Sequence, residues 1–256
     1  MDVEALKEEA GIAACKYVVE GMNVGLGTGS TVKYTILELG RRVREEGLTI
    51  VGVPTSIATR DLAREVGIPL ADLDDLDGLD VVIDGTDEFD PSFQLIKGGG
   101  AALLREKVVA QASKRMVVVA DDRKQVATLG AFPLPIEVTP FSFNTTKRAI
   151  ESILGCSVNM RMAGAEMLKT DNGNYIADAH TGPSIRDPEV TEQRLLALAG
   201  VVQVGLFNNM CNVVVMASET GVTVLTKADC ASSKSPMHQA LNRRGKRRVW
   251  ACSLVR

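Results

Sequence analysis

The stretch LDVVIDGTDE, residues 79–88, is a run of mainly apolar, β-branched side chains that ends in acidic residues. Such a run is typical of a strand that is buried on both faces of a parallel sheet. Helical spacing follows over residues 100–113, and a second apolar run, RMVVVADD, occupies residues 115–122. A strand, a helix and another strand in this order predict two parallel strands whose connecting helix packs on their sheet.

The same alternation extends toward the N-terminus. Only 4% of the residues are aromatic while 45% are apolar, a composition that favours parallel strands packed by helices over an all-β sandwich. We therefore predict an α/β fold built on a doubly wound, mostly parallel sheet. Further helices are expected over residues 1–20, 31–46 and 58–67, and further strands over residues 22–27 and 48–56.

A second unit follows the proline-rich segment LGAFPLPIEVTP, residues 129–140. Its expected strands cover residues 136–138, 157–162, 175–179 and 201–207, with helices over 144–154 and 187–200. The order β-α-β-β-α-β is that of a ferredoxin-like unit. Two later strands, over 212–218 and 221–227, are expected to return to the large sheet. The predicted domains are residues 1–132 with about 207–227, residues 133–206, and a tail over 228–256.

Charge is unevenly distributed along the chain. Residues 1–226 carry 21 basic and 31 acidic side chains, whereas residues 227–256 carry 8 basic and 1 acidic. Such a basic tail could contact nucleic acid or an acidic partner. We expect instead a solvated, poorly ordered end without a catalytic role, and no nucleic-acid partner.

Cysteine, histidine and hydropathy patterns limit the class of protein. The five cysteines are scattered without a C-x-x-C pair, which fits a reducing cytosol. No secretory signal and no membrane-spanning apolar run is found, so we expect a soluble cytoplasmic protein. His180 and His238 are the only histidines, which excludes a multi-histidine metal site. Carboxylates and lysines must therefore carry any chemistry.

The segment VGLGTGST, residues 24–31, places three glycines at a strand-to-helix turn. Backbone N–H groups and the helix dipole favour an anion there. The spacing matches neither the dinucleotide motif nor the Walker motif, and the next strand lacks the acid that binds a ribose. Thr28, Ser30 and Thr31 could add hydroxyl donors around a monophosphate beside Gly29. The alternative is a tight turn capped by Ser30 or Thr31.

Acidic residues follow the buried strand. Asp84 and Asp87 are expected at its carboxyl end, where ligands bind in open α/β sheets. Close carboxylates repel each other, so the pKa of one of them should rise toward neutrality. A solvated acidic turn and a Mg²⁺ site are the alternatives.

The segment IKGGGAALLREK, residues 96–107, combines a lysine, three glycines and a helix. Lys97 and the N–H groups of Gly98, Gly99 and Gly100 suit an oxyanion better than a metal. Arg105 and Glu106 both have apolar neighbours three and four residues away, so periodicity does not choose between them. Only a carboxylate can act as a base at pH 7, which favours Glu106, its pKa raised by desolvation.

Together, GLGTGST, DGTDE, KGGGAALLREK and LGAFPLPIEV resemble the type A family of ribose-5-phosphate isomerases, over about residues 6–227. The resemblance implies reversible conversion of ribose 5-phosphate to ribulose 5-phosphate without a metal or an organic cofactor. It also implies a Rossmann-like large domain, a smaller ferredoxin-like lid, and a homodimer or a dimer of dimers. Two rivals on related folds are an amino sugar phosphate deaminase and a non-catalytic sugar-phosphate sensor.

The resemblance also implies roles for individual residues. Glu106 matches the general base, and Asp84, Asp87 and Lys97 match the polar groups around the reacting end of the sugar. The implied substrate-binding residues are Thr28, Gly29, Ser30, Thr31, Gly85, Thr86, Gly98, Gly99, Gly100, Lys124 and Lys7. Lys124, from ADDRKQV, would be a counter-charge for the phosphate, although a solvated loop lysine is the ordinary interpretation. Thr86 stands where the family commonly has alanine, and residues 141–154 depart from bacterial relatives.

Overall fold

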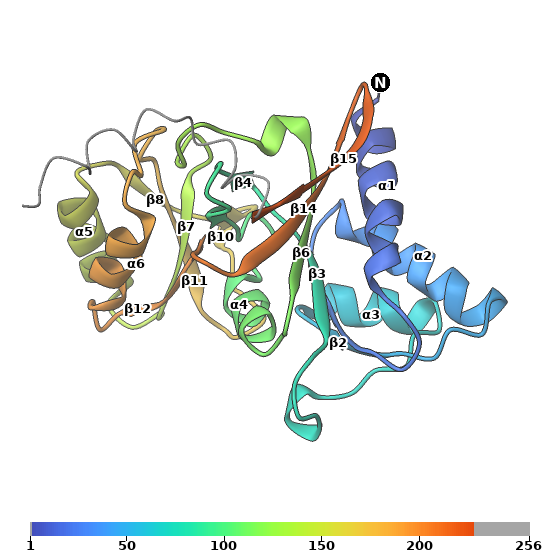
Figure 1. Cartoon of the computed structure of the whole chain (residues 1–256). Helices are drawn as coiled ribbons and strands as arrows, with labels where there is room; N and C mark the ends of the chain where they lie inside the picture. Colours follow the sequence, from blue (N-terminus) through green and yellow to red (C-terminus); the bar gives the residue numbers. More distant parts are fainter. Residues whose placement is uncertain (1, 228–256) are drawn as a thin grey trace, which may run out of the picture.

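The computed structural model describes residues 2–227, so the predicted basic tail over 228–256 lies outside the described residues. A central six-stranded sheet has the order β15-β14-β6-β3-β1-β2 (Figure 1). All neighbouring strands are parallel except β14 and β15, which confirms the predicted doubly wound, mostly parallel sheet. The strands are β1 (Asn23–Leu26), β2 (Val51–Pro54), β3 (Val81–Gly85), β6 (Met116–Asp121), β14 (Cys211–Ser218) and β15 (Gly221–Thr226).

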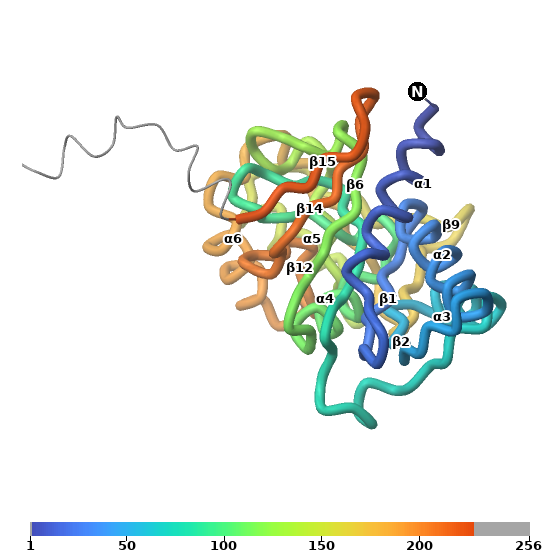
Figure 2. Tube along the Cα trace, turned by 45° about the vertical axis from the view of Figure 1, so that its right-hand side comes forward, coloured from blue at the N-terminus to red at the C-terminus, as the bar shows by residue number. Residues whose placement is uncertain are grey.

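Helices cover both faces of this sheet. The helices α1 (Val3–Ala14), α2 (Val32–Glu45) and α3 (Ile57–Glu65) pack on one face, with α1 across β6 and β14 (Figures 1 and 2). The helix α4 (Leu103–Gln111) packs on the other face. Side chains of β3 alternate between the faces: Val81 and Ile83 join the core under α1 and α2, and Val82 joins the core under α4. Asp84 lies two residues after Val82 on the same strand, so its side chain points to the same face, toward α4.

A four-stranded antiparallel sheet forms the second unit, in the order β12-β7-β11-β8. This is the fourth, first, third and second strand of the unit, the arrangement of a ferredoxin-like fold, as predicted. Its own apolar core lies between the sheet and the two helices. The elements are β7 (Leu134–Val138), α5 (Phe143–Leu154), β8 (Val158–Met160), β11 (Tyr175–Ala179), α6 (Pro188–Leu196) and β12 (Val201–Val204).

Very short strands connect the two units, and sequence periodicity did not predict them. A three-stranded sheet consists of β4 (Glu88–Phe89), β5 (Leu95–Ile96) and β13 (Leu206–Phe207). Its strand β13 follows Gly205 directly after β12, where one continuous strand was expected. A two-stranded hairpin, β9 (Met162–Ala163) and β10 (Glu166–Met167), likewise interrupts the strand expected over 157–162.

Three predicted helices are clearly shorter than expected, and one of them, α6, ends at Leu196 instead of residue 200. The helix α1 ends at Ala14 and continues only as a 3₁₀ turn over Cys15–Tyr17, instead of reaching residue 20. The helix α4 begins at Leu103 rather than residue 100, because Gly98 and Ala101 have φ of 110° and 59° and form a left-handed turn.

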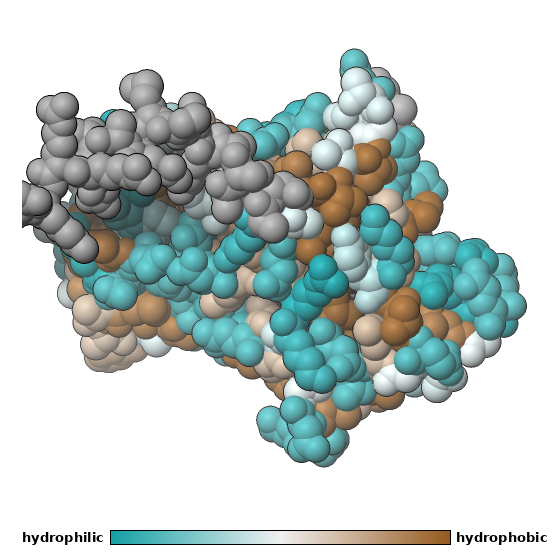
Figure 3. All heavy atoms as spheres, viewed as in Figure 1, coloured by the Kyte–Doolittle hydropathy of each residue, from teal (hydrophilic) through white to brown (hydrophobic). Residues whose placement is uncertain are grey.

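None of the helices within residues 2–227 is both long and apolar enough to cross a bilayer. Hydrophobic residues on the face in Figure 3 gather along α1 and β15, where exposed Ile12 and Val222 line one shallow groove.

Candidate active site

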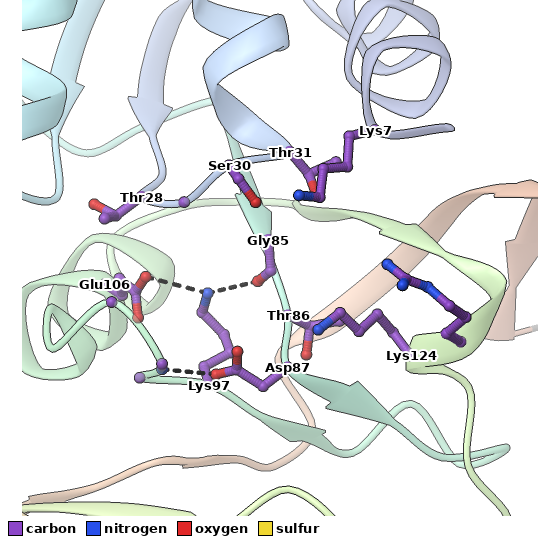
Figure 4. A pocket seen from close by; sticks show the side chains of 15 residues that line it. Lys7, Thr28, Ser30, Thr31, Gly85, Thr86, Asp87, Lys97, Glu106 and Lys124 are labelled. Carbon is purple, nitrogen blue, oxygen red and sulfur yellow. Dashed lines mark hydrogen bonds and ion pairs between the residues drawn. The ribbon is translucent and has the colours of Figure 1, made fainter. Parts of the chain in front are cut away.

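A cavity of about 190 Å³ lies at the carboxyl ends of β1, β3 and β6 (Figure 4). Every site residue predicted from the sequence lines it except Asp84, and Arg123 is an addition. The residues that line it are Lys7, Thr28, Gly29, Ser30, Thr31, Gly85, Thr86, Asp87, Lys97, Gly98, Gly99, Gly100, Glu106, Arg123 and Lys124. The structure thus brings together segments as far apart in the chain as Lys7 and Lys124, as expected for the carboxyl edge of a doubly wound sheet.

Asp84 lies behind the wall of this cavity, with its side chain completely buried. Its Oδ1 accepts hydrogen bonds from the N–H groups of Thr28, at 3.0 Å, and Gly85, at 2.8 Å. A Cβ on Gly27 would lie 2.2 Å from the same oxygen, so only glycine fits there. Asp84 therefore does not line the cavity, and its hydrogen bonds anchor the turn after β1 to β3.

Lys97 lies at the centre of the buried charges, with 2% of its side chain exposed. Its Nζ donates to the carbonyl oxygen of Gly85 at 2.6 Å and forms ion pairs with Asp84 Oδ2 at 3.0 Å and Glu106 Oε1 at 3.4 Å. One hydrogen bond and two ion pairs thus surround the buried ammonium group. Burial lowers the pKa of Lys97, but Asp84 and then Glu106 raise it by more, so the pKa lies above its ordinary value and the group stays charged.

Glu106 projects from the first turn of α4, and only 3% of its side chain is exposed. Burial raises its pKa to about 8, and the nearby Asp84 and Asp87 add to the shift while Lys97 opposes it. Its Oε2 has no hydrogen-bond partner among residues 2–227. A buried carboxylate with a pKa near neutrality can both take up and release a proton. Glu106 therefore has the chemistry of a general base.

Arg105, which periodicity could not separate from Glu106, points elsewhere. It is 38% exposed, and its guanidinium donates to Asn172 Oδ1 at 2.8 Å and to the carbonyl oxygen of Asp171 at 3.0 Å. The cavity is lined by Glu106 and not by Arg105.

Asp87 lines the cavity and is held by the glycine run. The N–H of Gly99 donates to Asp87 Oδ2 at 2.7 Å, a bond drawn in Figure 4. A Cβ on Gly99 would lie 2.5 Å from Asp87 Oδ1, which explains a glycine at this position. The Gly99 donor, expected to meet an oxyanion, is thus already engaged. The neighbouring Gly100 N–H has no acceptor among the residues that the structure describes.

The opposite end of the cavity is cationic. Lys7, from α1, and Lys124, from the 3₁₀ turn after β6, converge there with Ser30 and Thr31 (Figure 4). Lys7 is 2.6 Å from Glu4 and Arg123 is 2.7 Å from Asp121, whereas Lys124 has no ion-pair partner within residues 2–227. Arg123 was not predicted from the sequence, although it adjoins Lys124 at the same strand end.

The Thr28 hydroxyl is engaged by other hydroxyl groups rather than free for the phosphate end. Its Oγ1 lies 2.7 Å from Thr55 Oγ1 and 2.8 Å from Ser56 Oγ. Figure 4 shows this side chain turned away from Lys7 and Lys124. The expected hydroxyl donors around a phosphate are therefore reduced to Ser30 and Thr31. No group of three or more His, Cys, Asp and Glu side chains with the geometry of a metal site occurs within residues 2–227.

This chain is similar in sequence to proteins of a known family. A family model described as ribose 5-phosphate isomerase A (phosphoriboisomerase A) matches residues 51–221. A relative named ribose-5-phosphate isomerase A, from Jannaschia sp. (strain CCS1), is 51% identical over 225 residues, which are 86% of this chain and 86% of that protein. The chain belongs to the ribose 5-phosphate isomerase A family.

Solved structures of this family have the same fold. One D-ribose-5-phosphate isomerase, solved in complex with phospho-erythronic acid, is 40% identical and covers 88% of this chain and 100% of its own, with a TM-score of 0.85. The ribose 5-phosphate isomerase from Plasmodium falciparum is 37% identical and covers 88% of this chain and 99% of its own, also with a TM-score of 0.85.

The raised pKa of Glu106 predicts a pH-dependent stability. Because the folded-state pKa of about 8 exceeds the ordinary 4.5, the stabilising contribution is complete below pH 4.5 and is lost as pH rises through 8. Glu106→Gln removes this titration. Urea unfolding should be measured at several pH values. The free energy of unfolding of the variant should rise relative to that of the wild type by up to ~1.4 kcal/mol per pH unit in this window. A difference that stays constant from pH 4.5 to 8 would contradict the assignment.

Proposed function

We propose that this chain interconverts D-ribose 5-phosphate and D-ribulose 5-phosphate through an enediolate. The observation that carries the proposal is a buried base, Glu106, beside a buried cation, Lys97, in a cavity whose other end is cationic. Family membership gives the reaction type independently of that geometry. A related structure holds phospho-erythronic acid, a phosphorylated four-carbon acid whose carboxylate is comparable in charge to an enediolate.

Glu106 would move the proton between the two carbons. It removes the proton from C2 of the open-chain aldose, and the C–H electron pair becomes the C1–C2 double bond while the charge passes to O1. It then returns the proton to C1, the O2 hydroxyl loses its proton to O1, and C2 becomes the ketone carbon. A pKa of about 8 suits both steps, because the same group must accept and donate near neutral pH.

Lys97 would exchange one partner for another during this step. Its ammonium group donates to the carbonyl oxygen of Gly85 and forms ion pairs with Asp84 and Glu106. When Glu106 takes the proton it becomes neutral and its attraction for the ammonium falls. Negative charge appears at the same moment on the substrate oxygen. Lys97 can therefore stabilise the enediolate without leaving a buried charge unpaired at any stage.

Asp87 is the carboxylate that can open the furanose ring. It lines the cavity, whereas Asp84 is fully buried and holds Lys97 and the turn after β1. We assign ring opening, and proton transfer between the sugar hydroxyls, to Asp87. Asp84 would act by keeping Lys97 charged and in place.

The phosphate would occupy the cationic end. Lys124 and Lys7 supply positive charge, and the turn of Gly29, Ser30 and Thr31 supplies N–H and hydroxyl donors at the start of α2. A phosphate could take Lys7 from its exposed partner Glu4, because surface ion pairs are weak.

Several further properties belong to the same proposal. We propose that residues 133–206 act as a lid on the unit formed by residues 1–132 and about 207–227. We also propose that the enzyme is a homodimer or a dimer of dimers, works without a metal or organic cofactor, and is cytoplasmic.

A direct assay tests the function. The wild type should convert ribose 5-phosphate to ribulose 5-phosphate in the presence of EDTA. Glu106→Gln keeps the shape of the side chain but removes the base, so kcat should fall by about 10²- to 10⁴-fold. Binding of the sugar phosphate, measured by calorimetry, should survive in the variant.

Other outcomes would identify a rival function. Release of ammonia from an amino sugar phosphate would indicate a deaminase. Tight binding of ribose 5-phosphate without turnover would indicate a sensor. Near-wild-type turnover in Glu106→Gln would reject Glu106 as the base.

Lys124→Ala tests the phosphate end. Loss of one charged hydrogen bond should raise KM by about 10- to 100-fold and change kcat little. Lys114→Ala is the matched control, since Lys114 is 79% exposed, pairs with Asp80 and does not line the cavity. An unchanged KM in Lys124→Ala, or an equal rise in both variants, would remove Lys124 from the phosphate site.

A further inference from the structure

Arg161 belongs to the small unit but contacts the glycine run of the active site. It lies between β8 and β9 with 16% of its side chain exposed. Its Nε and one terminal nitrogen donate to the two carboxylate oxygens of Asp178 on β11, at 2.8 and 2.5 Å. This bidentate pair fixes the plane of the guanidinium. The other terminal nitrogen is thereby aimed at the large unit.

That nitrogen donates to two consecutive backbone carbonyls. The distances are 2.8 Å to Gly98 O and 3.0 Å to Gly99 O. In a trans peptide the N–H points opposite to the C=O of the same unit. An arginine that holds both carbonyls therefore turns the N–H groups of Gly99 and Gly100 to the other side of the loop.

Those two N–H groups belong to the wall of the cavity next to Asp87. The Gly99 N–H donates to Asp87 Oδ2 at 2.7 Å. Gly100 lines the cavity, and its N–H has no acceptor within the described part of the chain. Asp178, Arg161, the peptide between Gly98 and Gly99, and Asp87 thus form one hydrogen-bond chain across the wall of the site. Such chains strengthen each member, because each bond polarises the next.

The glycine run needs an external constraint. Three glycines in succession have little conformational preference of their own, and Gly98 has φ of 110°. The hydrogen bond from Ala101 N–H to Gly98 O, at 2.9 Å, closes one turn but leaves the Gly99 carbonyl unconstrained. If either peptide flipped, a carbonyl oxygen would face the position where negative charge develops.

We propose that Arg161 is a positioning residue for the isomerisation: it orients the N–H donors of Gly99 and Gly100 toward Asp87 and the substrate. The proposal rests on the proposed function. Arg161 does not line the cavity, so its effect must pass through the backbone that it holds. The small unit would in this way set the geometry of a cavity to whose lining it contributes no residue.

Arg105 provides a matched control. It also reaches between the units, from α4 to the turn at Asp171 and Asn172, through two hydrogen bonds and an ion pair with the Asp171 carboxylate. It makes no contact with the glycine run. Loss of docking between the units alone would affect Arg105→Ala and Arg161→Ala alike.

The test compares kinetics of the full chain in Arg161→Ala, Arg161→Lys and Arg105→Ala. Arg161→Ala should lower kcat by about 10- to 100-fold with little change in KM, because the donors are misplaced while the phosphate end is intact. Arg161→Lys, with a single point charge, should be intermediate. Arg105→Ala should stay within a few-fold of the wild type. Millimolar guanidinium chloride should restore part of the kcat of Arg161→Ala, and equal sodium chloride should not.

Every other outcome contradicts either the positioning role of Arg161 or the proposed function on which that role rests. Unchanged kcat in Arg161→Ala, an equal loss in Arg105→Ala, or no specific rescue by guanidinium would reject the positioning role. If Arg161→Ala does not fold, wild-type kcat in a folded Arg161→Lys would reject it. An inactive wild type in the same assay would instead reject the proposed isomerase function.

Discussion

The buried ammonium of Lys97 is the constraint on which the rest of the site depends. A charge with 2% exposure is tolerated only if opposite charges and hydrogen-bond acceptors lie close to it. Those acceptors come from the end of β3 and from α4, so strand and helix must meet at Lys97. The same cluster leaves Glu106 with more negative than positive charge around it in a desolvated position. A proton-accepting group near neutral pH is the consequence.

The small unit supports this cluster from behind. The backbone N–H of Lys97 donates to Gly205 O at 2.9 Å, next to the pairing of β5 with β13. Lys107, beside Glu106 on α4, is 2% exposed and donates to the carbonyl oxygens of Val204 and Leu206 at 2.7 and 2.8 Å. With the contacts of Arg161, these bonds connect the base, its cation and the glycine run to the small unit. Substitutions in the small unit should therefore alter the geometry of the cavity, although none of its residues lines that cavity.

The fold and most of the site could be predicted from local sequence patterns. Strand and helix periods are local, and the parallel sheet that follows from them brings polar strand ends to one edge. Strands of two residues, such as β5 and β13, are too short to have a period. The burial of Asp84 depends on which face of β3 receives α4, and the inward position of Glu106 relative to Arg105 depends on the turn that starts α4 at Leu103. Arg161 could not be found from the sequence, because its partners are backbone carbonyls more than sixty residues away.

The most direct measurement is a titration of the Glu106 carboxyl group by ¹³C NMR in the substrate-free protein, in the wild type and in Lys97→Met. We predict that Glu106 titrates near pH 8 in the wild type, because burial and two neighbouring carboxylates oppose its ionisation. Removal of the Lys97 charge should move the titration still higher, since that charge opposes the shift. An ordinary carboxyl titration near pH 4.5 in the wild type, or no upward change in Lys97→Met, would contradict the central role of this buried cluster.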